Sequence, residues 1–395
     1  MSTNKEIVVL SAVRTAIGTY GGSFAGTPPA DLAAAVIREA VARAGVAPED
    51  VGHAAIGNVV HTEARDMYMA RVAAVNGGLP HETPAVTVNR LCGSGLQAIV
   101  TATQLLELGH ADCAVAGGAE CMSRGQYWIP GARFGQRMGD GQIIDAMVGA
   151  LTDPFDSCHM GITAENVAEK WNVTRDEQDA LAAESHARAA AAIEAGYFKD
   201  QIVPIEIKKK REMVPFDTDE HVRPGTTAES LGKLRPVFKK DGSVTAGNAS
   251  GINDAAAAIV LMTAEAAEAK GLKPLARLVG YGFAGVEPKY MGIGPVPATR
   301  KLLDRTGLSV DDLDVCEVNE AFAAQALAVS KDLGLDPAKT NPNGSGISLG
   351  HPIGATGAVI SVKALHELQR TGGRYGLVTM CIGGGQGIAA IFERV

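Results

Sequence analysis

Three short glycine-rich segments carry residues that could do nucleophilic and acid–base chemistry. Cys92 stands in NRLCGSG, His351 in GHPIG and Cys381 in MCIGGGQG. A thiolate is a strong nucleophile, an imidazole can take its proton, and glycines let backbone N–H groups approach the oxygen of a substrate carbonyl. The three segments indicate covalent catalysis on an acyl group, in which one sulfur holds the acyl chain and another group moves protons.

Cys92 follows an expected strand over 85–88 and precedes an expected helix that starts near Leu96. A thiol at a helix N-terminus feels the positive end of the helix dipole and unpaired N–H groups, so its pKa is predicted to fall below the free value of ~8.5. A cysteine before a helix is just as often a packing residue. The position alone leaves both interpretations open.

The elements that must position these residues occur twice along the chain. Near the start, a helical segment at 30–44 leads through an acidic turn to a strand ending at Asn58. Near the end, a helical segment at 298–305 leads through an acidic turn to a strand ending at Asn319. After each copy comes a glycine-rich turn, a long apolar helix, and a strand with a glycine pair or triplet. The repetition predicts two homologous halves with a site where they meet.

The duplication changes the interpretation of His351, because a lone histidine in a glycine-rich turn is usually structural. Its position in the second half corresponds to that of Cys92 in the first, so we expect His351 to face Cys92 and to take its proton or stabilise its charge. Asn319 follows a strand over 315–318, where its amide could orient a water or the imidazole. The alternative for Asn319 is a plain helix cap.

Composition places these segments in an α/β protein. The chain has 395 residues, 46% hydrophobic and 20% charged, which excludes disorder and allows two or three domains. Short β-branched runs alternate with Ala/Leu-rich helical stretches, the pattern of a mostly parallel sheet. A net charge of -8 argues against nucleic acid as a partner. The longest apolar stretch, 255–262, is too short to span a membrane, so we expect no membrane segment and a cytoplasmic protein.

The six cysteines show neither CxxC spacing nor the density of a disulfide scaffold, so no metal site is predicted. Cys113 and Cys316 lie inside apolar runs and are expected to be inert. The stretch 122–250 differs from the halves and is predicted to be an inserted, lid-like domain with a helix at 175–195. The apolar side of that helix is expected to contain Leu181, Ala182, Ser185, Ala189 and Ile193.

The insert also contains a basic region, since residues 199–240 include ten Lys or Arg against seven Asp or Glu. An ordinary solvated surface and a dock for a phosphate-bearing substrate both fit this excess of positive charge.

Seven motifs resemble those of the thiolases, occur in the same order and extend over essentially the whole chain: NRLCGSGLQA, GGAECMS, HMGITAENVA, TAGNASGINDAA, NEAFAAQ, GHPIGATGA and MCIGGGQG. The chain resembles in particular the short-chain biosynthetic group, which comprises acetyl-CoA C-acetyltransferases and β-ketothiolases of polyhydroxyalkanoate synthesis. The resemblance implies a five-layer αβαβα sandwich of two duplicated halves, and normally a homotetramer. It divides the chain into an N-terminal half (1–121 and 251–274), a loop domain for coenzyme A binding and tetramerisation (122–250) and a C-terminal half (275–395).

The resemblance also implies roles for single residues. Cys92 matches the nucleophile that becomes acylated, His351 the base that activates it, and Cys381 the acid/base at the α-carbon of the second acyl-CoA. His351 and a water held by Asn319 match one oxyanion hole, and the backbone N–H groups of Cys92 and Gly383 match the other. The family's coenzyme A contacts match His159, Arg223, Ser230, Ala246 and Ser250, and its acyl-pocket wall matches Met160, Met291 and Phe322.

The implied activity is a ping-pong condensation of two acyl-CoA molecules to 3-ketoacyl-CoA, and it calls for no cofactor or metal because coenzyme A thioesters are the substrates. A degradative thiolase for longer chains is the main alternative, and acyl-pocket depth would discriminate the two. Cys381 argues against a decarboxylating ketoacyl synthase, which uses two histidines, and against a Cys-His-Asn hydrolase. An inactive acyl-binding relative would lack Cys92 or His351, and GxGxxG is absent after the first strand, which argues against a dinucleotide site.

Two positions depart from the family's pattern. Cys121 stands where many relatives carry Ser or Asn, and Gly125-Gln126 replaces the frequent Ala-Pro. Both lie at the start of the insert, so they concern loop entry and assembly contacts.

Overall fold

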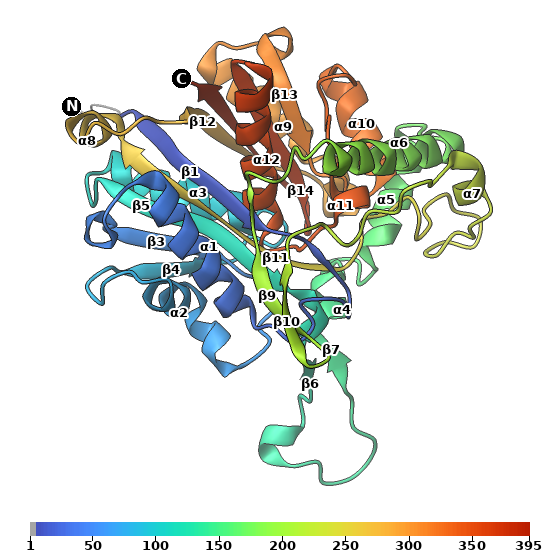
Figure 1. The fold of residues 1–395 in the computed structure, drawn as a ribbon. Helices are drawn as coiled ribbons and strands as arrows, with labels where there is room; N and C mark the ends of the chain where they lie inside the picture. Colours follow the sequence, from blue (N-terminus) through green and yellow to red (C-terminus); the bar gives the residue numbers. More distant parts are fainter. Residues whose placement is uncertain (1–4) are drawn as a thin grey trace.

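The computed structural model describes residues 5–395, and its core is a set of eleven hydrogen-bonded strands that crosses both halves (Figure 1). The main path runs β13-β14-β15-β12-β1-β11-β5-β3-β4. The first half contributes β1 (Ile7–Thr15), β3 (His53–Gly57), β4 (Ala85–Val88), β5 (Cys113–Cys121) and β11 (Asn253–Thr263). The second half contributes β12 (Ala276–Gly285), β13 (Leu313–Val318), β14 (Tyr375–Ile382) and β15 (Gln386–Arg394). The two parts join where β1 pairs with β12 over two residues, and the short β2 (Gly18–Thr19) and β8 (Ile202–Val203) pair at the margin.

Helices cover both outer faces and fill the space between the sheets. The outer helices are α1 (Pro29–Ala44), α2 (Met69–Asn76) and α8 (Ala264–Ala269) in the first half, and α9 (Pro295–Thr306) and α10 (Ala323–Leu333) in the second. The central helices are α3 (Ser94–Glu107) and α12 (Thr356–Thr371). Alternate residues of β1 enter different cores, since Val9 packs with α3 and α12 whereas Val8 packs with α1. The predicted five-layer αβαβα sandwich is confirmed.

The duplication is visible in local backbone geometry. Gly45 caps the C-terminus of α1 and Gly307 that of α9, both with φ of 68°, the left-handed conformation that glycine adopts without steric cost. Each is followed by a short 3-10 turn, at Pro48–Asp50 and Val310–Asp312, and then by β3 or β13. The same sequence pattern therefore builds the same turn twice.

The insert lies between β5 and β11 and contains α4 (Ala146–Ala150), α5 (Met160–Lys170), α6 (Arg175–Glu194), α7 (Ala228–Gly232), β6 (Tyr127–Trp128), β7 (Ile144–Asp145), β9 (Ile205–Lys209) and β10 (Glu212–Phe216). Thr174 caps α6 in a capping box with Glu177. The predicted face of α6 was partly wrong: Ala182, Ser185 and Ala189 are buried, but Leu181 and Ile193 are only half-buried. Polar residues replace them, because Ser185 donates to Glu320 and Asp179 accepts from Asn248.

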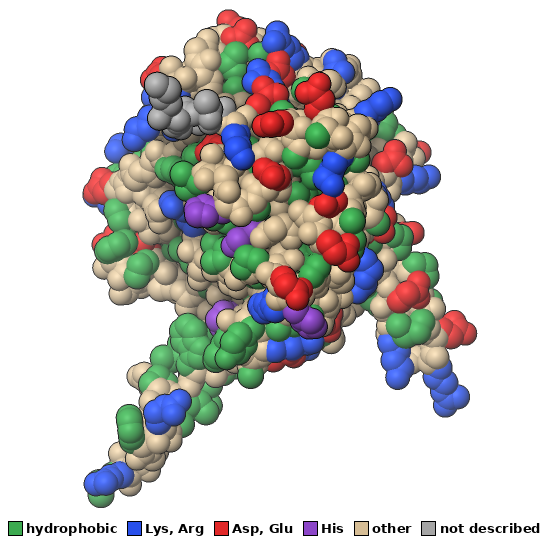
Figure 2. All heavy atoms as spheres, turned by 90° about the vertical axis from the view of Figure 1, so that its left-hand side faces the viewer, with side chains coloured by type: hydrophobic (Ala, Val, Ile, Leu, Met, Phe, Trp, Pro, Cys, Tyr) green, Lys and Arg blue, Asp and Glu red, His purple; other side chains and the backbone are tan. Residues whose placement is uncertain are grey.

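An arm formed by residues 127–145 extends away from the body at the bottom of Figure 1. Large apolar side chains on it are exposed, including Trp128 (53%), Phe134 (90%), Met138 (93%) and Ile143 (69%). Figure 2 shows hydrophobic side chains along this lowest projection. Within residues 5–395, no helix has the length and apolar character needed to cross a membrane.

Candidate active site

Cys92 sits in a tight turn between β4 and α3. Leu91 has φ of 45°, and the hydroxyl of Ser94 accepts from Arg90 N (2.8 Å) and donates to Leu91 O (2.6 Å), which fixes the turn. Gly93 brings the backbone against β14, where an added Cβ would lie 2.6 Å from Ile382 Cδ1. The glycine and the serine of CGSG thus place the nucleophile against the end of β14.

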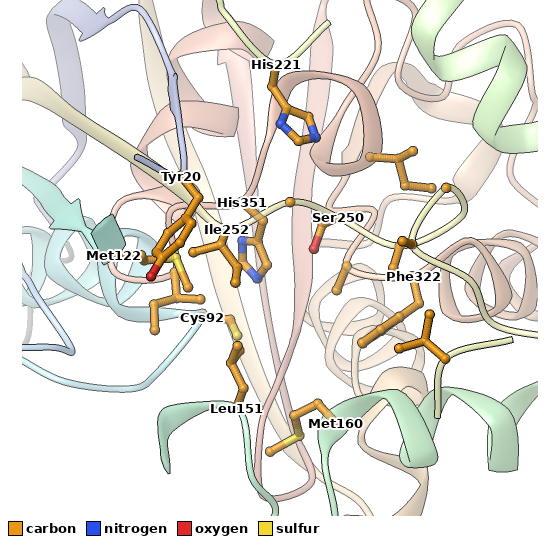
Figure 3. A pocket seen from close by; sticks show the side chains of 18 of the residues that line it. Tyr20, Cys92, Met122, Leu151, Met160, His221, Ser250, Ile252, Phe322 and His351 are labelled. Carbon is orange, nitrogen blue, oxygen red and sulfur yellow. The ribbon is translucent and has the colours of Figure 1, made fainter. Parts of the chain in front are cut away.

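Cys92 opens onto a cavity of about 760 Å³ lined by both halves and the insert. The cavity brings together nearly all the predicted site residues: Cys92, His159, Met160, Arg223, Ser230, Ala246, Ser250, Met291, Phe322, His351, Cys381 and Gly383. Asn319 alone is not in the lining; it lies behind His351, with Nδ2 3.4 Å from His351 Nε2. Figure 3 shows the Cys92 and His351 side chains directed into the same space.

His351 is held by three groups. Its backbone N–H donates to Asn253 Oδ1 (3.0 Å), its Nδ1 lies 2.6 Å from Thr356 Oγ1, and its Nε2 faces Asn319 Nδ2. An amide nitrogen only donates, so the hydrogen-bond network assigns the acceptor role to Nε2 and the proton to Nδ1. The Thr356 hydroxyl in turn donates a hydrogen bond to Pro352 O (2.9 Å). The imidazole is therefore oriented with Nε2 as its basic nitrogen.

Asn319 does not cap the next helix, because α10 has Phe322 at its N-cap with no side-chain cap bond. The plain-cap alternative is wrong. Asn319 is fully buried, and its Oδ1 has no hydrogen-bond partner among residues 5–395. A buried amide with an unpaired oxygen is suited to holding a water.

Burial dominates the acid–base properties of the site. It raises the pKa of Cys92 to about 11, although backbone N–H groups of Gly383 and of Cys92 itself stabilise the thiolate. Burial lowers the pKa of His351 to about 4. The expectation of a depressed Cys92 pKa was wrong, because the loss of hydration outweighs the helix N-terminus. The resting pair is a neutral thiol and a neutral imidazole, so the proton moves as the new bond to sulfur forms.

Cys381 lies at the end of β14 and is 1% exposed. Burial raises the pKa of its thiol, and the neighbouring Cys92 raises it further. Gly384 and Gly385 follow in left-handed conformations (φ 81° and 87°), which turns the chain sharply into β15. Cys381 also packs with Met160, Met291 and Phe322 in one apolar cluster.

The cavity changes from polar at its mouth to apolar at its base. Arg223, Ser230 and Ala246 are exposed, whereas Met160, Met291 and Cys381 are buried. Between them, Phe238 stacks on His159, with ring centroids 4.7 Å apart and an interplanar angle of 15°. An elongated ligand with a charged end and a thioester end fits this gradient.

Sequence reasoning missed several lining and supporting residues. Thr356 and Asn253, which hold His351, could have been predicted, because they stand in the thiolase-like motifs GHPIGATGA and TAGNASGINDAA. A second apolar wall beside Cys92 could not have been predicted from the sequence, because its residues come from separated segments. It consists of Met122, Leu151, Ile252 and Ile353.

Comparison with known proteins decides the family. The chain matches the family profile described as thiolase, N-terminal domain, over residues 7–265, and the one described as thiolase, C-terminal domain, over residues 272–394. The chain belongs to the thiolase family. Among relatives, it is 67% identical to the β-ketothiolase BktB of Cupriavidus necator, over 99% of this chain and 100% of that protein.

Solved thiolase structures resemble this one closely. The acetyl-CoA acetyltransferase of Bacillus anthracis superimposes with a TM-score of 0.98 at 49% identity, over all of both chains. Human mitochondrial 3-ketoacyl-CoA thiolase in complex with CoA superimposes with a TM-score of 0.96 at 45% identity, over 100% of this chain and 99% of the other. This thiolase thus shares its fold with one protein named as an acetyl-CoA acetyltransferase and one named as a 3-ketoacyl-CoA thiolase.

Proposed function

We propose that this thiolase is an acyltransferase that catalyses the reversible Claisen condensation of two short acyl-CoA molecules, acetyl-CoA with acetyl-CoA or propionyl-CoA, to 3-ketoacyl-CoA and CoA. One observation carries the proposal: Cys92, His351 and Cys381, which come from three distant segments, line a single cavity. Family membership gives the reaction class, and the neutral, oriented imidazole beside the thiol supports the residue roles.

In the first half-reaction, Cys92 Sγ attacks the thioester carbonyl carbon of the first acyl-CoA while Nε2 of His351 takes the thiol proton. The tetrahedral oxyanion is stabilised by the backbone N–H groups of Cys92 and Gly383. The C–S bond to coenzyme A breaks, Cys381 gives its proton to the leaving CoA thiolate, and His351 keeps the proton that it took from Cys92. The products are an acyl-Cys92 and free CoA.

In the second half-reaction, Cys381, left as a thiolate by the first, removes an α-proton from the second acyl-CoA. The enolate oxygen is stabilised by the protonated Nε2 of His351 and by a water on Asn319, and each such donor is typically worth ~2.7 to 4 kcal/mol. The carbanion attacks the acyl-Cys92 carbonyl, a C–C bond forms and the C–S bond to Cys92 breaks. Cys92 regains its proton from His351 while Cys381 keeps the α-proton, which restores the resting state without a metal or redox step.

Short acyl groups are favoured because side chains close the cavity on both sides of Cys92. Met160, Met291 and Phe322 stand on one side, and Leu151 and Ile252 on the other. The unbranched methionine side chains can adjust to an acetyl or a propionyl group. The degradative alternative, with longer chains, predicts faster thiolysis of 3-ketohexanoyl-CoA than of acetoacetyl-CoA, and comparing those rates with 3-ketovaleryl-CoA separates the two.

Incubation with acetyl-CoA should leave an acetyl mass on the peptide that contains Cys92. The Cys92→Ser variant should lose both label and turnover, whereas Cys381→Ala should still become acylated but fail to condense. Condensation by Cys381→Ala at the native rate would refute the role given to Cys381. Cys113→Ala is a matched control, since that cysteine is buried in β5 outside the cavity lining.

For coenzyme A, we propose that the nucleotide and pantetheine portions contact a set of five cavity residues: His159, Arg223, Ser230, Ala246 and Ser250.

We further propose a cytoplasmic homotetramer. Residues 122–250 form its coenzyme A-binding and tetramerisation domain. One half consists of residues 1–121 together with 251–274, and the other consists of residues 275–395. The exposed apolar side chains of the 127–145 arm support this assembly. Light scattering of the chain, and of a variant with Trp128 and Phe134 replaced by serine, tests it: a tetramer that survives the double change would contradict the arm's role.

A further inference from the structure

Glu120 is a buried carboxylate that the mechanism above does not use. It lies near the end of β5, is 0% exposed, and accepts four hydrogen bonds. The donors are Asn58 Nδ2 (3.1 Å) and Val60 N (3.1 Å) to Oε1, and Val59 N (3.1 Å) and Gly354 N (2.8 Å) to Oε2.

The contacts favour the ionised form of this group. Each carboxylate oxygen faces two N–H donors, and none of these four donating groups can accept a carboxyl proton. Burial raises the pKa of Glu120 to about 8, while the N–H groups of Val60, Gly354 and Val59 act in the opposite direction, so the carboxylate is ionised above about pH 8, where the Cys92 thiol titrates. Four directed donors are the arrangement that holds a buried carboxylate in the charged state.

Glu120 joins the two halves at the active site. Gly354 stands three residues after His351, in the loop that carries the imidazole, while Val59 and Val60 follow β3 of the first half. The loop is packed tightly on β5: a Cβ at Gly354 would collide with Glu120 Oε2, and one at Gly118 would collide with Gly354 O. Within residues 5–395, the Gly354 backbone N–H donates to no side chain other than Glu120.

We propose that Glu120 is a positioning residue for acyl transfer: its carboxyl group fixes the His351 loop of the second half against the half that carries Cys92. The expected loss of kcat rests on the proposed function, whereas the expected position of the His351 loop does not. The carboxylate holds Gly354 by one strong hydrogen bond and the opposing turn by three more, so the separation of His351 and Cys92 depends on it.

Glu120 also acts on Cys92 through its charge. Burial is the main cause of the high Cys92 pKa, and the negative charge of Glu120 raises it further. Among the residues that line the cavity with Cys92, His351 and Cys381 are neutral in the resting state, and burial lowers the pKa values of His159, His186 and His221. Removal of the Glu120 charge should therefore move the titration of Cys92 to lower pH.

The test compares Glu120→Gln with Asp66→Asn. Glutamine keeps the length but offers one acceptor oxygen and places an NH₂ group against N–H donors. Asp66 is a matched control because it is also 0% exposed and holds backbone N–H groups of Thr62 and Glu63, yet makes no contact with the His351 loop. Three quantities are measured: kcat and KM for acetoacetyl-CoA thiolysis, urea unfolding, and the pH dependence of Cys92 alkylation by iodoacetamide.

We expect Glu120→Gln to lower kcat by on the order of 10²-fold, with KM nearly unchanged, since a shift of about 1 Å in a catalytic group has that effect. Cys92 alkylation should shift to lower pH. Asp66→Asn should lose stability while keeping kcat and the alkylation profile. A native kcat in Glu120→Gln, or a loss that only follows the unfolded fraction, would overturn the proposal, as would an unshifted alkylation profile.

A second variant covers the case in which Glu120→Gln does not fold. Glu120→Asp keeps the charge but shortens the side chain, so we expect it to retain the native alkylation profile and still to lose kcat. Full activity in Glu120→Asp would overturn the positioning role. Failure of the proposed function would look different, because wild-type protein would then show no acetylated Cys92, whereas alkylation would still report the effect of Glu120.

Discussion

Thr356 is the residue whose replacement tests most directly how His351 is oriented. In the Thr356→Val variant the side chain keeps its shape but loses the oxygen that lies 2.6 Å from His351 Nδ1. Since His351 is only 5% exposed, the Nδ1–H group would be left without a partner in a site that water reaches poorly. The tautomer with Nε2 as the free base would lose its stabilisation.

The magnitude follows from the cost of an unsatisfied buried donor, about 1 to 3 kcal/mol. If that cost falls on the catalytically competent tautomer, about 1.4 kcal/mol per tenfold converts it to a loss of about 5- to 150-fold in kcat. KM for the acyl-CoA should change little, because Thr356 does not line the cavity.

The assay is thiolysis of acetoacetyl-CoA over a range of pH, with urea unfolding measured in parallel. Thr356→Ser serves as the control, because a serine hydroxyl can restore both the bond to Nδ1 and the bond to Pro352 O. We expect Ser to retain most of the activity and Val to lose it. Native kcat in a folded Thr356→Val variant would refute the assigned tautomer, and equal losses in Ser and Val would refute the role of the hydroxyl.

Three further predictions concern pH, stability and binding. The kcat/KM profile should lack an acid limb near pH 6.5, because burial lowers the pKa of His351 to about 4 and the neutral base persists until the pH approaches that value; a limb that starts near 6.5 and disappears in His351→Asn would contradict this. Arg14→Met should lower the free energy of unfolding in urea by about 3 to 5 kcal/mol, since it leaves Asp219 buried without its bidentate partner; an unchanged midpoint would show that the pair is not required. Gly161→Ala should raise KM for acyl-CoA by about 2- to 10-fold with a smaller effect on kcat, because the added methyl would collide with the Phe238 ring that stacks on His159; a larger loss in kcat than in KM would place the effect at the reacting atoms instead.

Much of the fold could be predicted because its signals are local. One pattern occurs twice in the sequence: a helix, a glycine, an acidic turn and a strand. The backbone is the same at Gly45 and Gly307, because each helix ends with a glycine in the left-handed conformation. Helix α6 was predicted within one residue of its bounds. The buried face of α6 was harder to predict, because it contains the polar residues Ser185 and Asp179. Their hydrogen-bond partners, Glu320 and Asn248, lie far away in the sequence.

In the candidate site too, some features could be predicted from the sequence and others depend on tertiary contacts. Cys92, His351 and Cys381 could be identified because each residue type has its own chemistry and stands beside glycines. The sign of the Cys92 pKa shift could not be predicted, because it depends on how much protein surrounds the sulfur and not on the adjoining helix. The supporting contacts of Glu120 were equally out of reach, since its partners Asn58 and Gly354 lie far from it along the chain.

The sequence by itself determined which groups can react, where strands and helices alternate, and that one unit occurs twice. The tertiary structure alone decided which of those groups meet, which nitrogen of His351 holds the proton, and which charge each buried group carries. The reason is physical: periodicity and residue chemistry act over a few neighbouring residues, whereas desolvation and hydrogen bonding depend on atoms that come together only when the two halves pack against each other.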